Sequence, residues 1–400
     1  SGKLKVISFF AKKARGMMVR YLIEHNASTL EELKGFTFGG YAFSAAETSG
    51  DLIASSLVAA LKQNHPHCEI DGLAGDKMIE AGCNSLWHTD EVNVMGLSEV
   101  LKKLPSVLKL RTKVTNHYIS NKPDVFIGVD SPDFNFRIEH SLKKEGVKTI
   151  HFISPSVWAW RSKRIKKIKA STDLVLCLFP FEVDFFTQHN QKAIFVGHPL
   201  AETLRPREKY KQNKSVLLMP GSRESEIKIL LPELIEAVRV MQSRDSELTF
   251  NLSLANANHR DWVEKSIEGL SIKISIGDAH KRIIDSDLVL VASGTAALEV
   301  ALLAVPMVVI YKLSYLSYQI VKRLLNTKEV SLPNKILGKR VVPELIQNDA
   351  NGQNISDHAM TLLGSDNSEL VSELEKIYVL LNHDSSSKSA EAIIEFINEK

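Results

Sequence analysis

Cysteine is scarce in this sequence, which has only Cys68, Cys83 and Cys177 in 400 residues, with no paired spacing. Such a scattered set argues against a disulfide framework and a cysteine-based zinc site, and it favours a reducing cytoplasm. The HExxH motif is missing and the 13 histidines are scattered, so we expect no metal site. GxGxxG is missing too, which argues against a standard NAD domain, and we expect no cofactor.

A strong charge imbalance is also missing. Lysine and arginine number 50 against 47 aspartates and glutamates, so the net charge is only +3, and we expect no nucleic-acid partner. The hydrophobic fraction of 44% and the charged fraction of 24% are typical of a soluble globular chain. The length is sufficient for two domains, each with its own core.

No apolar run is long enough and clean enough to predict a membrane span. The longest, Leu288–Tyr311, is interrupted by polar residues, by Glu299 and by Pro306. A carboxylate at midspan is costly in lipid. We therefore predict that this window divides into a strand, a turn, a helix and a second strand.

Short β-rich runs alternate with helical patterns along most of the chain. The candidate strands are Asp124–Val129, Lys148–Ile153, Leu174–Leu178, Ala193–Val196, Ser215–Met219, Thr249–Leu254, Leu288–Ala292 and Met307–Tyr311. These runs are nearly continuously apolar, which is typical of parallel strands buried on both faces. The pattern predicts an α/β fold with two Rossmann-like domains and a ligand cleft at the carboxyl ends of their strands.

A repeated segment and a polar linker suggest how the chain divides. ASTDLVLCL (170–178) and IDSDLVLVA (284–292) share one plan, and the polar stretch Gly197–Lys214 separates the two halves. We expect an atypical N-terminal segment over 1–43, Rossmann-like domains over 44–200 and 201–350, and a helical tail over 351–400 that packs back on the first domain.

Two strand-to-helix turns in the second half have the composition of anion sites. Pro220-Gly221-Ser222-Arg223 can direct backbone N–H groups and a forked cation at phosphate. Ser293-Gly294-Thr295 opens a helix in which Glu299 can reach a ribose diol. Each turn can also be an ordinary loop or helix cap. Together they favour a nucleotide diphosphate site.

Acidic, basic and apolar residues mark three further segments. Asp130 ends a buried strand and is a candidate general base, with Asp133 as its orienting partner; both can instead be turn and cap residues. The basic run Arg161–Lys169 can be a solvated helix or contact an anionic partner. Val94–Val114 can be a core-facing amphipathic helix or a membrane-surface segment that contacts acyl chains.

Ten motifs in sequence order carry a resemblance to a known family. They are ETSGD, AGDKMIEAGC, VMGLSEVL, PDVFIGVDSPDFN, HFISPSVWAWR, TDLVLCLFPFE, PGSRESEI, ASGTAALE, PMVVIYK and VSLPN. From about Ala46 onward the chain resembles the lipid-A-disaccharide synthases, glycosyltransferases of the GT-B type. Ala46 stands where that family usually has glycine before the glutamate.

The resemblance implies an inverting transfer that joins UDP-2,3-diacylglucosamine to 2,3-diacylglucosamine 1-phosphate and releases UDP. Asp130 would take the proton of the acceptor 6-hydroxyl, and Glu47 and Ser49 would form the cleft wall. The implied UDP-sugar site consists of Ser222, Arg223, Gly294, Thr295, Ala296, Glu299 and Asn334. The implied acceptor and membrane contacts are Met95, Leu97, Val100, Leu101 and Leu104. The implied location is the inner face of the cytoplasmic membrane, as a peripheral protein that can form a homodimer.

The first 43 residues resemble a different family, the C-terminal end of the YaaA peroxide-stress proteins, most specifically in KVISFFAKKARGMM. The stretch FTFGGYAFSAAETSGD is therefore interpreted as a junction. Gly40–Ala45 would serve as a substitute first strand, short and loosely packed, beside the sheet that positions Asp130.

Two other functions remain open on the sequence. One is a non-catalytic lipid- or nucleic-acid-binding protein of the same fold whose altered N-terminus prevents turnover. The other is a different UDP-sugar enzyme, such as a 2-epimerase, although the acyl-type segment Val94–Val114 argues against it.

Overall fold

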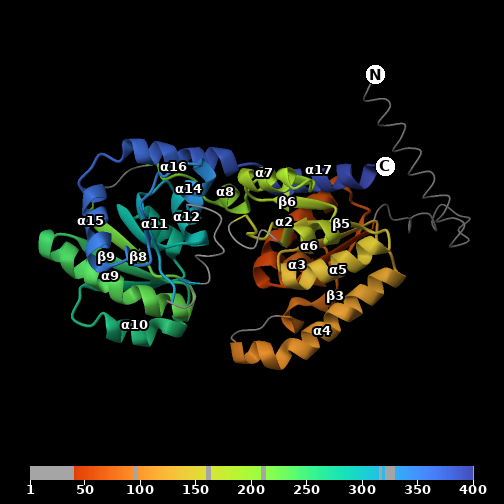
Figure 1. Cartoon of the computed structure of the whole chain (residues 1–400), viewed down its shortest axis with the longest axis horizontal. Helices are drawn as coiled ribbons and strands as arrows, with labels where there is room; N and C mark the ends of the chain where they lie inside the picture. The colour runs from red at the N-terminus through yellow and green to blue at the C-terminus, as the bar shows by residue number, and fades with distance from the viewer. Residues whose placement is uncertain are drawn as a thin grey trace, which may run out of the picture.

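The computed structural model describes residues 40–92, 97–158, 164–208, 213–314, 318–319 and 329–399. They form two α/β domains side by side, each built on a wholly parallel sheet (Figure 1). The predicted architecture of two Rossmann-like domains is therefore confirmed. The segment 1–39, which holds most of the YaaA-like resemblance, lies outside the described residues.

The first sheet has seven strands in the order β3-β2-β1-β4-β5-β6-β7. Its strands are β1 (Gly40–Ala45), β2 (Glu69–Ala74), β3 (Asn84–His88), β4 (Val125–Val129), β5 (Lys148–Phe152), β6 (Leu174–Cys177) and β7 (Ala193–Phe195). The helices of this half are α2 (Thr48–Asn64), α3 (Asp76–Glu80), α4 (Leu97–Ser120), α5 (Pro132–Lys144), α6 (Ile165–Ser171), α7 (Pro180–Gln188) and α8 (Pro199–Thr203).

The second sheet has six strands in the order β10-β9-β8-β11-β12-β13. They are β8 (Ser215–Met219), β9 (Thr249–Leu254), β10 (Ile272–Ile276), β11 (Leu288–Ala292), β12 (Met307–Tyr311) and β13 (Glu344–Ile346). The helices that connect and cover them are α9 (Glu224–Arg244), α10 (Arg260–Ser266), α11 (Ala279–Ile284), α12 (Thr295–Leu302) and α14 (Leu332–Leu337). The apolar window 288–311 divides into strand, helix and strand as predicted.

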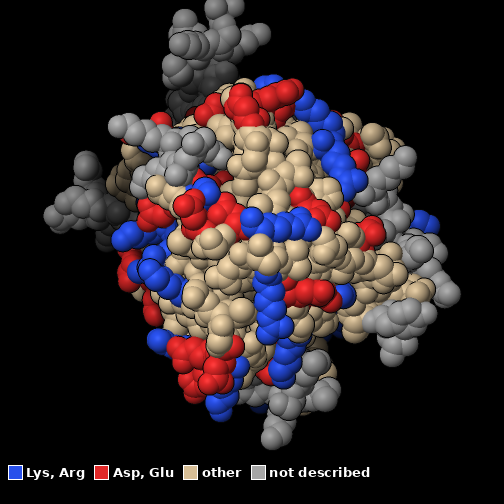
Figure 2. All heavy atoms as spheres, turned by 90° about the vertical axis from the view of Figure 1, so that its left-hand side faces the viewer, with Lys and Arg blue, Asp and Glu red and all other residues tan. Residues whose placement is uncertain are grey.

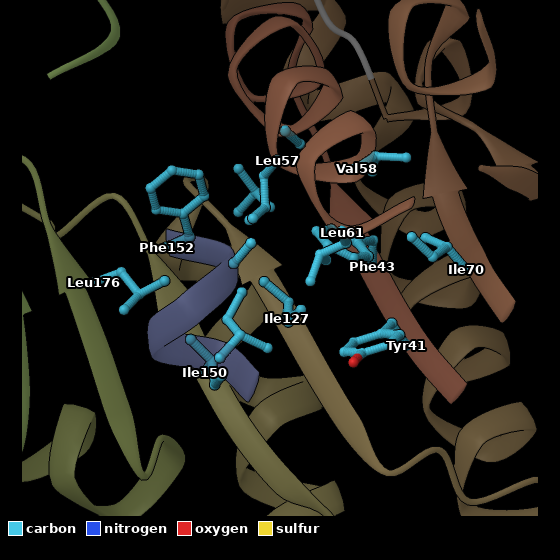
Figure 3. Close-up of a cluster of buried hydrophobic side chains, with 14 of the residues drawn as sticks. Tyr41, Phe43, Leu57, Val58, Leu61, Ile70, Ile127, Ile150, Phe152 and Leu176 are labelled. Carbon is cyan, nitrogen blue, oxygen red and sulfur yellow. The ribbon is translucent and has the colours of Figure 1, made fainter. Parts of the chain in front are cut away.

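Strand β1 lies at the centre of the first sheet, between β2 and β4. Strand β1 therefore pairs within the sheet that carries Asp130, as expected. The expectation that β1 is loosely packed is wrong. Residues 41–45 are all buried, and Phe43 has no exposed surface. Figure 3 shows Tyr41 and Phe43 among side chains of α2 and of the neighbouring strands, including Leu61 and Ile127. Aromatic residues here fill the space that Val and Ile fill in an ordinary buried strand.

Three C-terminal helices connect the two domains: α15 (Gly352–Leu363), α16 (Ser368–Leu381) and α17 (Ser385–Asn398). Helix α15 packs on α9, and α16 packs on α12 and α14 of the second domain. Helix α17 packs on α2 of the first domain, so the chain ends beside the domain in which the described part begins (Figure 1).

The end of the second domain that carries α9 and α15 has a mixed surface charge. Figure 2 shows Lys and Arg interspersed with Asp and Glu on this face. One such pair, Arg244 and Asp357, joins the two helices at 2.6 Å. In the described part of the chain, none of the helices is both long and apolar enough to cross a membrane.

Candidate functional site

A pocket of about 440 Å³ lies at the carboxyl ends of the strands of the second domain. We call it the C-terminal pocket. Both predicted anion turns line it, one after β8 and one after β11. Its lining includes six of the seven predicted UDP-sugar residues, Ser222, Arg223, Gly294, Thr295, Ala296 and Glu299. The carboxyl end of a parallel sheet is where ligands of doubly wound domains bind.

The turn after β8 presents a cation at the mouth of this pocket. Gly221 has φ +110°, and a Cβ there would lie 2.7 Å from a carboxylate oxygen of Glu226, so the position requires glycine. Arg223 caps α9 and donates from Nη1 to Glu226 Oε1 at 2.9 Å. The Arg223 side chain is 79% exposed. Such a surface pair contributes little, so a diphosphate can compete for the guanidinium.

The turn after β11 places the start of α12 and a carboxylate in the same pocket. Thr295 is the first residue of α12, whose free N–H groups favour an anion. Glu299 accepts from His280 Nε2 at 3.0 Å, depending on the imidazole tautomer. Ser253, near the end of β9, and Ala255, just after it, also line the pocket. Sequence reasoning missed these two residues and Glu226, although the position of Ser253 at a strand end was a usable signal.

Asn334, the seventh predicted residue, does not line the C-terminal pocket. It is fully buried, and its amide nitrogen donates to Val342 O at 2.9 Å and to Glu344 Oε1 at 2.8 Å. Its amide oxygen accepts from the N–H groups of Val341 and Val342. In this arrangement Asn334 fixes the loop between α14 and β13.

In the first domain, Asp130 and Ser131 form a strained turn at the end of β4. Their φ angles are +50° and +41°, in the left-handed region that L-residues seldom adopt. Buried Asn135 holds the turn, since its amide donates to the carbonyls of Val129 and Asp130 at 3.1 and 2.9 Å. It also accepts from the hydroxyl of Ser44 on β1 at 2.7 Å.

The ETSGD turn lies beside this strained turn. Glu47 precedes α2 and accepts from the Ser131 hydroxyl at 2.7 Å. Asp51 is buried and accepts from the N–H groups of Gly75 and Lys77 at 2.8 and 3.0 Å. A Cβ at residue 75 would lie 2.6 Å from that carboxylate, which explains the glycine in the AGDK motif. These hydrogen bonds thus hold the ETSGD and AGDK motifs together.

A second pocket of about 920 Å³, the N-terminal pocket, lies between these turns and helix α4. Glu47 and Ser49 line it, together with Ser131 and Asp133, and Asp133 is paired with Arg164 at 2.9 Å. Of the predicted acceptor and membrane residues, Leu104 lines the pocket and is 45% exposed. Met95 lies outside the described residues, and only the backbone is described for Leu97, Val100 and Leu101, in the first turns of α4.

Comparison with known proteins identifies the family. The lipid-A-disaccharide synthetase family matches residues 41–397. The chain belongs to this family. Relatives named lipid-A-disaccharide synthase include one from Colwellia psychrerythraea, 40% identical over 90% of this chain and 95% of that protein. Another, from Idiomarina loihiensis, is 40% identical over 88% of this chain and 97% of that protein.

Residues 1–47 match a second family, the peroxide stress protein YaaA. The two matches overlap in the strand β1 and the turn after it. The interpretation of the N-terminus as a junction between two families therefore agrees with both matches, and the synthase match reaches back to residue 41.

Solved structures that resemble this chain share its fold at low identity. The calicheamicin glycosyltransferase CalG4 superposes with a TM-score of 0.57 at 12% identity, over 90% of this chain and 99% of that chain. UDP-GlcNAc 2-epimerase from Neisseria meningitidis superposes with a TM-score of 0.56 at 11% identity, over 90% and 98%. The fold is thus shared by transferases and epimerases, whereas the family is that of a glycosyltransferase of lipid A biosynthesis, and the two alternative functions are not favoured.

Proposed function

We propose that the chain joins UDP-2,3-diacylglucosamine to 2,3-diacylglucosamine 1-phosphate, giving the β(1→6) disaccharide phosphate and UDP. The observation that supports this most is that six residues expected to contact the UDP-sugar line one pocket in a chain of the synthase family. Arg223 and the starts of α9 and α12 would stabilise the diphosphate, and Glu299 would bind the ribose.

The proposed reaction is a single displacement. The 6-hydroxyl oxygen of the acceptor attacks C1 of the donor, the bond from C1 to the diphosphate oxygen breaks, and UDP leaves. The Asp130 carboxylate takes the hydroxyl proton, while Arg223 and the helix N-termini neutralise the departing UDP. The configuration at C1 inverts because there is one attack and no covalent intermediate. The reaction would take place at the inner face of the cytoplasmic membrane, with the apolar side chains of α4 facing the lipid.

One assay tests the proposal: purified protein is mixed with both diacylated sugars, and UDP release is measured. We expect release that depends on both sugars and a disaccharide phosphate in equal amount. UDP release from the donor alone would indicate hydrolysis or epimerisation, and no release from the complete mixture would contradict the proposal.

A further inference from the structure

Three basic side chains from three different helices line the N-terminal pocket: Arg111 of α4, Arg137 of α5 and Lys167 of α6. Among the described residues none of them has a carboxylate partner. Two carboxylates line the same pocket, and both are engaged elsewhere: Asp133 is paired with Arg164, and Glu47 accepts from the Ser131 hydroxyl. The lining therefore carries three cations against two carboxylates, which is an excess of positive charge.

Three other arginines on helices of the chain are arranged differently. Arg244, Arg260 and Arg282 each pair with a carboxylate at 2.6–2.7 Å. Arg111 is instead half-buried, and burial together with the nearby charge of Arg137 lowers the pKa of its guanidinium. Arg137 is exposed, and two guanidiniums that repel each other are stabilised when an anion binds between them.

Apolar residues of the same pocket precede Arg111 on the same helix, α4. Leu104 and Leu108 of α4 are 45% and 39% exposed, and Val92 and Val107 lie beside them. The pocket thus combines apolar and cationic side chains, a combination that complements a molecule with acyl chains and an anionic group. Glu47 and Ser131, beside Asp130, lie in the same lining.

We propose that Arg111 and Arg137, assisted by Lys167, bind the phosphate monoester of the acylated acceptor sugar, while Leu104 and Leu108 contact its acyl chains. This proposal rests on the proposed function and names the acceptor site. Arginine suits the task because its planar fork donates two parallel hydrogen bonds to phosphate oxygens. The contact would also orient the sugar, because the phosphate on C1 and the 6-hydroxymethyl group on C5 are attached to the two carbons that flank the ring oxygen, so a fixed phosphate restricts where the 6-hydroxyl can lie.

The test compares two acceptors, 2,3-diacylglucosamine 1-phosphate and the same sugar without phosphate, both in neutral detergent micelles. The variants are Arg111→Gln and Arg137→Gln. Matched controls are Lys109→Gln and Lys113→Gln, since both lysines are exposed on α4 and lie outside the pocket lining. We expect each arginine variant to lower kcat/KM for the phosphorylated acceptor at least about tenfold. The phosphate-free acceptor should change little, and UDP affinity should stay the same.

Equal losses on both acceptors, or equal losses in the lysine controls, would overturn the proposal. An arginine effect that arises only when anionic lipid is added to the micelles would assign these residues to the membrane surface instead, which also overturns it. A direct measurement of binding of the phosphorylated acceptor to wild type and Arg111→Gln needs no turnover. It therefore separates failure of this site from failure of the proposed reaction.

Discussion

Asp130 has an unusual backbone conformation for an aspartate at the end of a buried strand. Two consecutive non-glycine residues with positive φ, Asp130 and Ser131, cost about 1–3 kcal/mol each. The bonds from Asn135 to both neighbouring carbonyls offset that cost and fix the turn. The place of Asp130 directly after an apolar run could predict that it lies at the end of a strand. It could not predict the strain, which depends on a side chain five residues later reaching back to β1.

Asp130→Ala tests the base directly. We expect transfer to fall by about 10²–10⁴-fold, the usual contribution of a general base, with UDP affinity nearly unchanged because Asp130 lies in the other domain from the C-terminal pocket. Turnover is measured as UDP release and affinity by calorimetry. Asp133→Asn is the control, since that carboxylate is engaged by Arg164. If Asp133→Asn loses transfer and Asp130→Ala keeps it, the two roles must be exchanged.

Arg223→Ala tests the predicted diphosphate contact. Hydrogen bonds to a charged group contribute about 1.5–3 kcal/mol, so we expect UDP affinity to fall at least about tenfold. Arg244→Ala is the matched control, because Arg244 lies at the other end of the same helix and pairs with Asp357. Unchanged UDP affinity in Arg223→Ala would remove this residue from the site.

At the scale of elements, the buried strands could be predicted and the polar ones could not. Ser215–Met219 and Thr249–Leu254 have the bounds expected from their apolar runs. Strands β2 and β10 gave no such signal, because Glu69, Asp71 and Lys273 interrupt their apolar character. The Asp71 carboxylate gains a hydrogen-bond partner only in the folded chain, where the hydroxyl of Tyr118, on α4, donates to it at 2.7 Å. Local patterns do not contain that long-range partner.

The two pockets also differ in how far the sequence could predict them. Both turns of the C-terminal pocket could be predicted because each is a contiguous motif after an apolar strand. Asn334 was implied by family resemblance alone, and the fold places it in a buried network with Glu344. Of the basic residues in the N-terminal pocket, only Lys167 lies in a basic run that the sequence marks, Arg161–Lys169. The pattern could not predict the cluster, since Arg111, Arg137 and Lys167 come together only when α4, α5 and α6 pack.

Helix α7 contains a buried acidic group whose ionisation couples to folding. Glu182 accepts from Phe179 N and from Trp158 Nε1, both at 3.2 Å, and burial raises its pKa to about 8. The folded protein keeps the Glu182 carboxyl protonated at pH values above its ordinary pKa of 4.5. The stabilisation that this proton contributes is therefore lost as pH rises from about 5 to about 8.

Glu182→Gln removes this titration. Relative to wild type, the free energy of unfolding of the variant should rise with pH between 5 and 8, by up to about 1.4 kcal/mol per pH unit. Urea unfolding at four pH values measures the difference. Glu375→Gln, at an exposed position of α16, should give a difference that does not vary with pH. A pH-independent difference for Glu182→Gln would mean that Glu182 is ionised in the fold throughout this range.

At the scale of the whole molecule, contacts far apart in sequence join the two domains. Lys335 of α14 lies 5.7 Å from the ring centre of Trp158 and 5.6 Å from that of Phe181, both in the first half of the chain. The C-terminal helix is also held to the first half of the chain, because the backbone N–H of Ser385, where α17 begins, donates to Glu202 of α8 at 2.7 Å. The first domain is completed only by the last helix, since Lys148 donates to the carbonyls of Phe396 and Ile397 at 2.8 and 3.0 Å.

Ile393→Ala tests whether α17 stabilises the first domain specifically. Ile393 is fully buried in the core shared by β1, β4 and α2. We expect the free energy of unfolding to fall by about 2–5 kcal/mol, because the variant buries less apolar surface and leaves a cavity. Hydrogen exchange should accelerate at the amides of β1 and β4 and stay unchanged in β8 and β11, which belong to another core. Val379→Ala, at a side chain that is 71% exposed on α16, should change neither. Equal acceleration in both sheets would mean that the domains unfold as one unit. Because β1 borders the Asp130 turn, faster exchange confined to the first domain should lower transfer while UDP binding in the second domain persists.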